Sequence, residues 1–305
     1  MEDTNEALLE KIKNLKKSRN AILLVHNYQL GEVQDIADFT GDSLELSQKA
    51  AKTVADVIVF CGVHFMAETA SILCPDKIVL LPDEHAGCPM ADMITPERLR
   101  EKKKEHPNAT VVCYVNTSAA VKAESDVCCT SANAVKIVEK LADAEEIIFV
   151  PDQYLGSYVT SQTGREMILW PGFCPTHVRI QVQDIIRLKA EYPQAKVIVH
   201  PECRTEEKTI ADAVLSTGGM IRFARETDST EIIVGTEIGI LHRLRKENPG
   251  KKFIPISEQA ICPRMKLITL ETVLWSLENM SHQVKVPEEI RLKAKGAVDK
   301  MLEVT

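Results

Sequence analysis

The sequence predicts an α/β fold of three homologous α/β/α units with short parallel sheets, arranged about a pseudo-threefold axis. A Cys-Pro dipeptide recurs at near-constant intervals of 86 and 88 residues, at Cys88, Cys174 and Cys262. In the same phase, three apolar strand-like runs end in a ring side chain, at His26, Tyr114 and His200. A period that runs through a whole chain is typical of one supersecondary unit in several copies.

A hydroxyl residue follows each of these strand ends by seventeen residues. The three hydroxyl residues are Ser43, Ser131 and Thr217. The chain has 305 residues, so each copy has roughly 87 residues, and a lone unit of that size would bury little surface. We therefore expect the three units to share a core.

The first unit shows the alternation of strands and helices that is typical of parallel α/β layers. Its predicted order is strand, short helix, short strand, helix, strand, helix and strand, followed by the loop with Cys-Pro. Strands are predicted over 21–26, 56–61 and 77–81, and helices over 43–53 and 65–73. The strands are rich in Val and Ile, which predicts burial of both sheet faces.

The other two units repeat this order. In the second, strands are predicted over 110–115, 126–130, 146–150 and 167–170, and helices over 132–142 and 153–163. In the third, strands are predicted over 196–200, 231–235 and 252–256.

Charged helices are predicted between the units. They cover 96–105 and 182–191, a helix over 5–17 takes the matching place before the first unit, and 288–302 is helical without a counterpart. The predicted boundaries are a helix over 1–18 with a first unit over 19–105, a second over 106–192, a third over 193–282 and a C-terminal helix over 283–305.

Composition excludes several classes of function. A net charge of −7 provides no basic stripe for nucleic acid. No apolar run approaches the roughly 20 residues that span a membrane. The first predicted helix is rich in Lys and Glu and lacks the apolar core of a signal peptide. We therefore expect a cytoplasmic protein without a nucleic-acid or membrane partner.

Nine cysteines in a cytoplasmic chain do not predict a disulfide framework, because the cytosol keeps thiols reduced. Six of them are out of phase with the repeat, and we expect these to be buried packing residues. They are Cys61, Cys74, Cys113, Cys128, Cys129 and Cys203. The three cysteines in phase would instead meet at the axis.

The strand ends are the predicted ligand-binding positions, because ligands of parallel α/β sheets bind beyond the carboxyl ends of the strands. Each strand end offers a polar pair two residues apart, and the side chains of such a pair point the same way on an extended chain. The pairs are His26 with Tyr28, Tyr114 with Asn116, and His200 with Glu202. The three hydroxyls either cap the following helices or help the helix amides to hold a carboxylate or phosphate.

Three converging thiolates leave one coordination position of a metal centre unfilled. A structural Zn²⁺ with three Cys and a His is one possibility, although local Cys-x-x-Cys pairs are absent. A [4Fe–4S] cluster with one open iron is another, and that iron would act as a Lewis acid in dehydration chemistry. Spacing alone does not separate these sites from buried structural cysteines. His177, three residues after Cys174, is a fourth ligand, a donor to substrate or a surface residue.

The same residues belong to motifs that resemble the quinolinate synthase A family nearly from end to end. The motifs are His26-Asn27-Tyr28-Gln29, Gly41-Asp42-Ser43, Gly62-Val63-His64-Phe65-Met66-Ala67-Glu68, Tyr114-Val115-Asn116, Thr130-Ser131-Ala132-Asn133, His200-Pro201-Glu202-Cys203 and Ser216-Thr217-Gly218-Gly219. The resemblance implies a [4Fe–4S] cluster on Cys88, Cys174 and Cys262 with one iron open to substrate. It also implies that iminoaspartate and dihydroxyacetone phosphate condense to quinolinate, the precursor of NAD, with loss of phosphate and water.

The resemblance also suggests roles for the other residues of the site. Anionic groups would be bound by Ser43, Ser131 and Thr217, and hydrogen bonds and positive charge would come from His26 and His200. The intermediate would be oriented by Tyr114 and Asn116. Protons would be moved by Glu202 and Tyr28, and His177 would contact substrate. An aspartate oxidase or dehydrogenase is the expected upstream partner.

Two other functions remain open at this stage. Another Fe–S hydro-lyase, acting on a small hydroxy-acid, would use the same open iron without a triose phosphate. A non-catalytic protein would use the three cysteines for structural Zn²⁺ or an iron sensor cluster. The sequence departs from some family members, which carry a Cys-x-x-Cys-x-x-Cys run at the third ligand, because Cys262 stands alone here. We therefore expect no thiol–disulfide regulation at that site.

Overall fold

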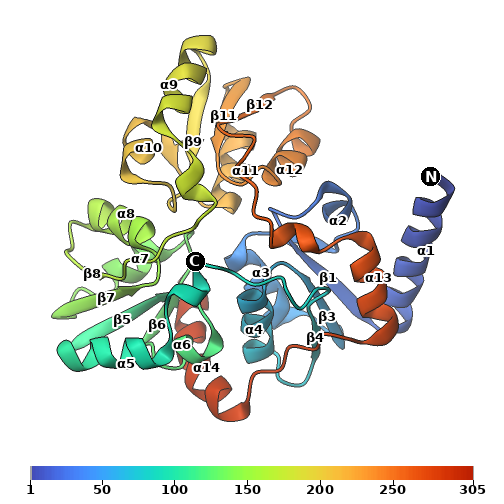
Figure 1. Cartoon of the computed structure of the whole chain (residues 1–305), viewed down its shortest axis with the longest axis horizontal. Coiled ribbons are helices and arrows are strands. Elements are labelled where there is room, and N and C mark those ends of the chain that lie inside the picture. The colour runs from blue at the N-terminus through green and yellow to red at the C-terminus, as the bar shows by residue number, and fades with distance from the viewer. Residues whose placement is uncertain (1, 305) are drawn as a thin grey trace.

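Three four-stranded sheets, each entirely parallel, lie around a common centre (Figure 1). The computed structural model describes residues 2–304 of the chain. The strands are β1 (Ala21–His26), β2 (Phe39–Gly41), β3 (Val57–Cys61), β4 (Ile78–Leu80), β5 (Ala109–Tyr114), β6 (Val127–Cys129), β7 (Glu146–Val150), β8 (Ile168–Leu169), β9 (Lys196–Val199), β10 (Ala213–Val214), β11 (Glu231–Gly235) and β12 (Lys252–Pro255). The predicted fold class, three α/β units around one axis, is confirmed.

Helices separate the strands in every unit. They are α1 (Glu2–Ser18), α2 (Gly31–Asp35), α3 (Ser43–Lys52), α4 (His64–Leu73), α5 (Pro96–Glu105), α6 (Ala119–Lys122), α7 (Ala134–Glu139), α8 (Gln153–Thr163), α9 (Val182–Glu191), α10 (Thr205–Ile210), α11 (Thr217–Glu226), α12 (Ile240–Glu247), α13 (Leu270–Asn279) and α14 (Glu288–Leu302). A short 3₁₀ helix follows each of the three Cys-Pro dipeptides. The three are Ala91–Met93, His177–Arg179 and Met265–Leu267.

The three sheets share one strand order and one register. The orders are β2-β1-β3-β4, β6-β5-β7-β8 and β10-β9-β11-β12. The first and second strands of each unit pair at a separation of fifteen residues, as in Leu24↔Phe39, Val112↔Val127 and Ile198↔Ala213. Because all strands of a sheet run the same way, the first strands deliver their last residues to the same edge, which faces the centre (Figure 1).

Helix α13 was not predicted from the sequence. It begins eight residues after Cys262, just as α5 and α9 begin eight residues after Cys88 and Cys174. The third copy of the linker helix therefore lies at the C-terminal end of the period, where it packs against α1 and β3 of the first unit. Helix α14 packs against α4 of the first unit and against α6 and β6 of the second.

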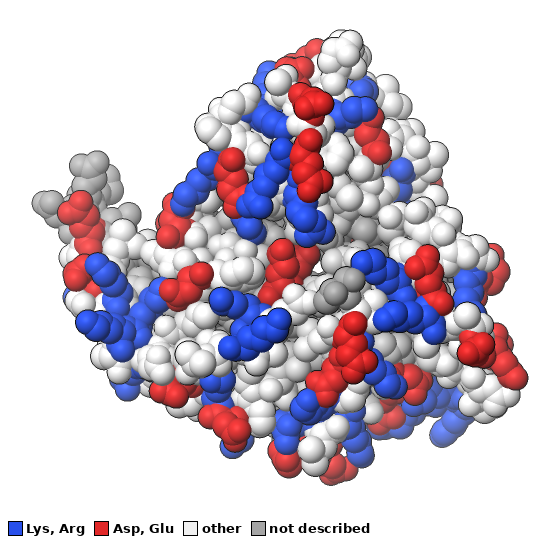
Figure 2. All heavy atoms as spheres, turned by 180° about the vertical axis from the view of Figure 1, so that it is seen from behind, with Lys and Arg blue, Asp and Glu red and all other residues white. Residues whose placement is uncertain are grey.

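The six cysteines out of phase with the repeat are buried, as predicted. Strand β3 is buried along its whole length, which agrees with the expectation that both faces of the sheets are covered. On the surface, acidic and basic side chains are interspersed over the face shown in Figure 2. Over the described residues, no helix combines the length and apolarity needed to cross a membrane.

A repeated aspartate joins the first and second strands of every unit. Asp38, Asp126 and Asp212 accept a hydrogen bond from the backbone N–H of Leu23, Val111 and Val197, each at 2.8 Å. The backbone N–H of each aspartate returns a bond to the carbonyl of the same strand residue, at 2.8 to 3.1 Å. These aspartates follow the strand-end residues by twelve positions, in phase with the repeat. Each therefore holds the first and second strands of its sheet in the same register.

Replacing Asp212 with Ala is expected to lower the free energy of unfolding by about 1.5 kcal/mol, because the N–H of Val197 loses a charged acceptor. Asp212→Asn keeps an oxygen that can accept this bond, so it should cost less. Urea unfolding of both variants, followed by circular dichroism, measures the difference. Equal stability of Asp212→Ala and the parent protein would show that the aspartate does not hold the register.

Candidate active site

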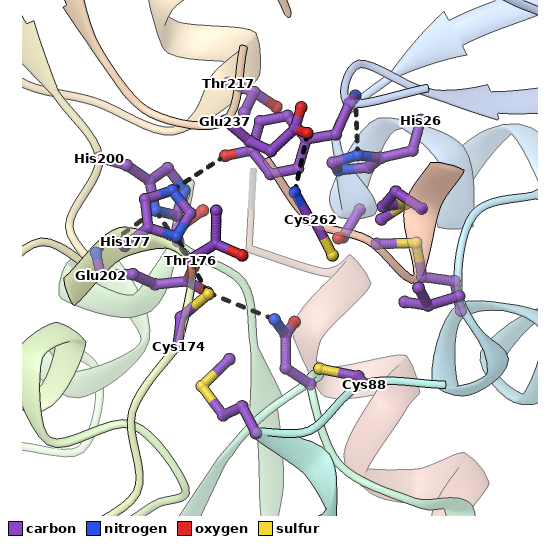
Figure 3. Close-up of a pocket in the computed structure, with 18 of the residues that line it drawn as sticks. His26, Cys88, Cys174, Thr176, His177, His200, Glu202, Thr217, Glu237 and Cys262 are labelled. Carbon is purple, nitrogen blue, oxygen red and sulfur yellow. Dashed lines mark hydrogen bonds and ion pairs between the residues drawn. The ribbon is translucent and has the colours of Figure 1, made fainter. Parts of the chain in front are cut away.

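A cavity at the centre of the molecule is lined by residues of all three units (Figure 3). It brings together all thirteen residues that the sequence singled out, namely His26, Tyr28, Ser43, Cys88, Tyr114, Asn116, Ser131, Cys174, His177, His200, Glu202, Thr217 and Cys262. It also includes Glu237 and Thr176, which the sequence did not indicate, and Asp42, which belongs to the Gly41-Asp42-Ser43 motif but has no predicted role. The apolar part of the wall includes Phe65, Met66, Met90 and Met265.

Two histidines enter the cavity as neutral hydrogen-bond donors. The Nδ1 atom of His26 accepts the backbone N–H of Tyr28 at 3.2 Å, and the Nδ1 atom of His200 accepts that of Glu202 at 3.3 Å. The proton of each neutral ring is therefore on Nε2. Burial lowers the pKa of both His26 and His200 to about 3. These pKa values argue against a positive charge on the two rings, and the role of His26 and His200 towards a substrate stays a prediction.

Glu202 is a buried carboxylate that collects donors from the second unit. Its Oε1 atom accepts from the Tyr114 hydroxyl at 2.7 Å and from the Asn116 amide at 3.3 Å. Its Oε2 atom lies 2.8 Å from Nδ1 of His177. Burial opposes ionisation of Glu202, but His177 at 2.8 Å and the hydrogen bond from Tyr114 lower its pKa to about 2.

A chain of hydrogen bonds leads from Glu202 to Tyr28. Nδ1 of His177 lies 2.8 Å from Glu202, and its Nε2 lies 2.8 Å from the Thr236 hydroxyl. Thr236 in turn lies 2.5 Å from the hydroxyl of Tyr28. Burial, reinforced by the charge of Glu202, raises the pKa of Tyr28. The phenol therefore keeps its proton and stands at one end of a relay whose other end is a carboxylate.

The three hydroxyls are free of the capping role that was their simplest alternative. Ser43 and Thr217 are the first residues of their helices, and the caps are the preceding Asp42 and Ser216. Asp42 accepts from two backbone amides of α3, and Ser216 accepts from Gly219. At Ser131 the local bonds are made by Thr130 and Asn133. The hydroxyls thus line the cavity beside helix N-termini, which favour anions.

The three Cys-Pro loops present their sulfur atoms in one common geometry. In each loop the amide N–H groups two and three positions after the cysteine point at its sulfur; they are Met90 and Ala91, Thr176 and His177, and Arg264 and Met265. Burial nevertheless raises the pKa of all three thiols, to about 12 at Cys88. Three such sulfurs on one cavity fit a cationic metal centre, which would hold them as thiolates.

Cys174 has an additional polar neighbour, because His177 Nδ1 lies 3.1 Å from its sulfur. The possible ligand atoms of Cys174, His177 and Glu202 all lie within 4.8 Å of one another. Figure 3 shows the rings of His177 and His200 close together beside Glu202, and their centroids are 4.7 Å apart. Because both nitrogens of His177 already face partners, the ring is better suited to positioning Glu202 than to binding a metal.

Glu237 is a site residue that the sequence did not reveal. Its side chain is fully buried and accepts the backbone N–H of Cys262 at 3.0 Å and that of Gly239 at 2.7 Å. Lys266 forms an ion pair with it at 2.9 Å. Glu237 stands two residues after β11, at the place that Asp152 occupies after β7. A carboxylate at this strand end was the available signal, but the first unit has Val63 there.

Glu237→Gln is expected to loosen the Cys262 loop. A carboxylate can accept from both backbone amides, whereas a carboxamide offers one oxygen and leaves a buried N–H unpaired, at a cost of about 1.4 kcal/mol, or tenfold in local opening. In the metal-free protein, Cys262 should therefore react roughly tenfold faster with iodoacetamide. Mass spectrometry of the alkylated peptides measures this rate, and Cys88 in the same molecule is the control. Equal acceleration at both cysteines would contradict the assignment.

These features define a class of enzyme in which three α/β units enclose a buried polar cavity with three cysteines. Over residues 10–303 the chain matches a family model described as Quinolinate synthetase A protein. The chain belongs to the quinolinate synthetase A family. Membership places it among the enzymes that make quinolinate, in NAD biosynthesis.

Similar proteins match over nearly their whole length. A quinolinate synthase of Dehalococcoides mccartyi (strain CBDB1) is 63% identical over 299 residues, which cover 98% of this chain and 99% of that protein. A quinolinate synthase of Methanosarcina barkeri (strain Fusaro) is 57% identical, with 97% of each chain covered. Quinolinate synthase 2 of Methanosarcina acetivorans is 54% identical and covers all of this chain and 97% of its own.

Proposed function

We propose that this enzyme condenses iminoaspartate with dihydroxyacetone phosphate to give quinolinate, one phosphate and two waters. The observation that carries the proposal is the convergence of Cys88, Cys174 and Cys262, one from each unit, on a cavity that also holds anion-binding hydroxyls and a proton relay. The proposal includes a cytoplasmic location and a supply of iminoaspartate from an aspartate oxidase or dehydrogenase.

The three cysteines would hold a [4Fe–4S] cluster with one iron open to substrate. Such an iron supplies Lewis-acid chemistry that assists the departure of hydroxide. The amide groups that point at each sulfur favour thiolates, as a cluster requires. A closed zinc site is less well supported, because His177 faces Glu202 and Thr236 with its two nitrogens.

The anionic groups of the substrates would be seated by the hydroxyls and helix N-termini. Ser43 and Thr217 stand at the first positions of α3 and α11, and Ser131 precedes α7. The dipoles of these helices favour anions at their N-termini. The Nε2–H groups of His26 and His200 add neutral donors that orient carbonyl or carboxylate oxygens without neutralising them.

Proton transfer would use the relay. Glu202 is held ionised by its neighbours and has a low pKa, so it would take up a proton only briefly during tautomerisation and return it through the relay. Tyr28 keeps its proton and can donate it to an enolate or carbonyl oxygen, while Thr236 and His177 connect it to Glu202. Tyr114 and Asn116 orient Glu202 and line the cavity on the side of the second unit, where they would orient the intermediate.

The function is tested by an anaerobic assay of the cluster-reconstituted protein with iminoaspartate and dihydroxyacetone phosphate. Quinolinate and phosphate should appear together, and Cys88→Ala should abolish both and lower the iron content, because one of three sulfur ligands is lost. An oxygen-labile cluster without quinolinate or phosphate would favour another Fe–S hydro-lyase. Binding of zinc alone would favour a structural metal site and overturn the proposal.

Glu202→Gln should lower kcat by about a hundredfold or more, because the carboxamide cannot accept a proton. Tyr28→Phe should lower kcat by roughly tenfold to a hundredfold, since water can replace a phenolic donor only in part. Both variants keep the three cysteines, so the visible absorption of the cluster should be unchanged. Full turnover in either variant with an intact cluster would remove that residue from the mechanism.

A further inference from the structure

One more set of side chains recurs in phase with the repeat. Eight residues after each strand-end residue, the short helix that follows carries a side chain with a nitrogen donor. The three are Gln34 on α2, Lys122 on α6 and Lys208 on α10. They do not line the cavity, and the proposed chemistry assigns them no step.

In the first two units these nitrogens bind matching backbone carbonyls. The Nε2 atom of Gln34 donates to Asn27 O at 3.3 Å and to Gln29 O at 2.9 Å, the two neighbours of Tyr28. The Nζ atom of Lys122 donates to Val115 O at 2.8 Å and to Thr117 O at 2.5 Å. Those carbonyls flank Asn116. In both loops, the carbonyls on either side of a cavity-facing residue are held by one side chain.

The third unit keeps one of the two flanking contacts and replaces the other with a contact between units. The Nζ atom of Lys208 donates to Pro201 O at 3.2 Å, beside Glu202, and to Tyr154 O at 2.5 Å on α8 of the second unit. Gln34 makes a comparable contact with the third unit through Gly239 O at 2.8 Å. Both side chains therefore tie a strand-end loop to the neighbouring unit.

Lys122 is the most unusual member of the set, because its side chain is fully buried. The partners of its amine are the two carbonyls and the face of the Phe65 ring, whose centroid lies 5.5 Å away. Burying an ammonium group is costly unless its hydrogen bonds are satisfied. A buried lysine that serves two loop carbonyls therefore indicates that the position of this loop matters, since an apolar side chain would cost less in the core.

We infer that Gln34, Lys122 and Lys208 are positioning residues: each fixes a strand-end loop so that Tyr28, Asn116 or Glu202 points into the cavity. The bonds between Glu202 and the second unit require this order, because Tyr114 and Asn116 reach the same oxygen of Glu202 at 2.7 and 3.3 Å. A shift of about 1 Å in a reacting group is enough to cost a hundredfold in rate. The catalytic consequence rests on the proposed function, whereas the order of the loops does not.

The test compares Lys122→Met with Lys122→Gln. The Met side chain keeps the length and apolar stem but has no donor, whereas Gln provides the donor that Gln34 uses at the equivalent place. Lys189→Met is the matched control, because its amine also donates to two carbonyls, Ala195 O at 2.8 Å and Pro193 O at 3.3 Å. That lysine is on α9, and the two carbonyls precede β9, at the end of the strand away from the cavity.

The first measurement is hydrogen exchange of backbone amides in the metal-free proteins. Lys122→Met should raise exchange at residues 115–118 by about tenfold, and Lys122→Gln should stay close to the parent protein, since lost bonds to the loop carbonyls release the loop. Lys189→Met should change exchange only around residues 193–195. Unchanged exchange at 115–118 in Lys122→Met would overturn the inference.

The second measurement is turnover of the cluster-loaded proteins, with the melting temperature recorded alongside. Lys122→Met should lose kcat by tenfold to a hundredfold, and Lys122→Gln should restore most of it. A kcat loss that merely follows the melting temperature, or one shared by Lys189→Met, would indicate a general structural role and contradict positioning. If the parent protein makes no quinolinate, the proposed function fails, but the exchange data still decide the order of the loops.

If Lys122→Met does not yield folded protein, Lys208→Met carries the same test at residues 202–203, the amides that follow Pro201, since Lys208 is only partly buried. Lys208→Gln is then the conservative variant. Faster exchange at 202–203 in Lys208→Met, restored in Lys208→Gln, supports the inference; no difference between these two variants overturns it.

Discussion

The structure depends on the ionised carboxylate of Glu202 at its centre. A charge in a dry interior costs several kcal/mol unless hydrogen bonds and opposite partial charges surround it. Glu202 belongs to the third unit, whereas its donors Tyr114, Asn116 and His177 come from the second unit and its following loop. The two units must therefore keep one mutual orientation to keep this group solvated by protein. The first unit joins through Tyr28 and the relay.

The parallel topology of the three sheets determines where the other polar groups of the site lie. Each sheet delivers the last residue of its first strand to the central edge, and the next long helix of the first and third units begins there with a capped N-terminus. Because Asp42 and Ser216 cap the helices, Ser43 and Thr217 are not needed as caps; the Thr217 oxygen accepts from Asn27 at 2.9 Å, and its hydroxyl hydrogen can still be donated to a ligand. The cavity thus combines donors fixed by backbone geometry with a carboxylate fixed by contacts between units.

The sequence period was sufficient to predict the fold class, most strands to within a residue or two, and twelve residues that line one cavity, because all of these repeat along the chain. His177, indicated by its place three residues after Cys174, lines the same cavity. The period missed Glu237 and Thr236, whose roles come from side-chain contacts made once, in the third unit. It does not predict α13, because the charged helix over 5–17 already fills the place of a third linker in the sequence pattern. Nor can the burial of His26 and His200, or the bond that each Nδ1 accepts, be predicted from residue type.

The equal register of the three sheets bears on the orientation in which the site can bind a ligand. A cavity with true threefold symmetry would bind any ligand in three equivalent orientations. The reacting groups of the ligand would then be distributed among three places. Here the three backbones are equivalent, but the residues two positions after the strand-end residues differ. They are a phenol at Tyr28, an amide at Asn116 and a carboxylate at Glu202. The scaffold keeps its symmetry while the side chains make the three positions chemically different, so that an asymmetric ligand fits the cavity in one orientation.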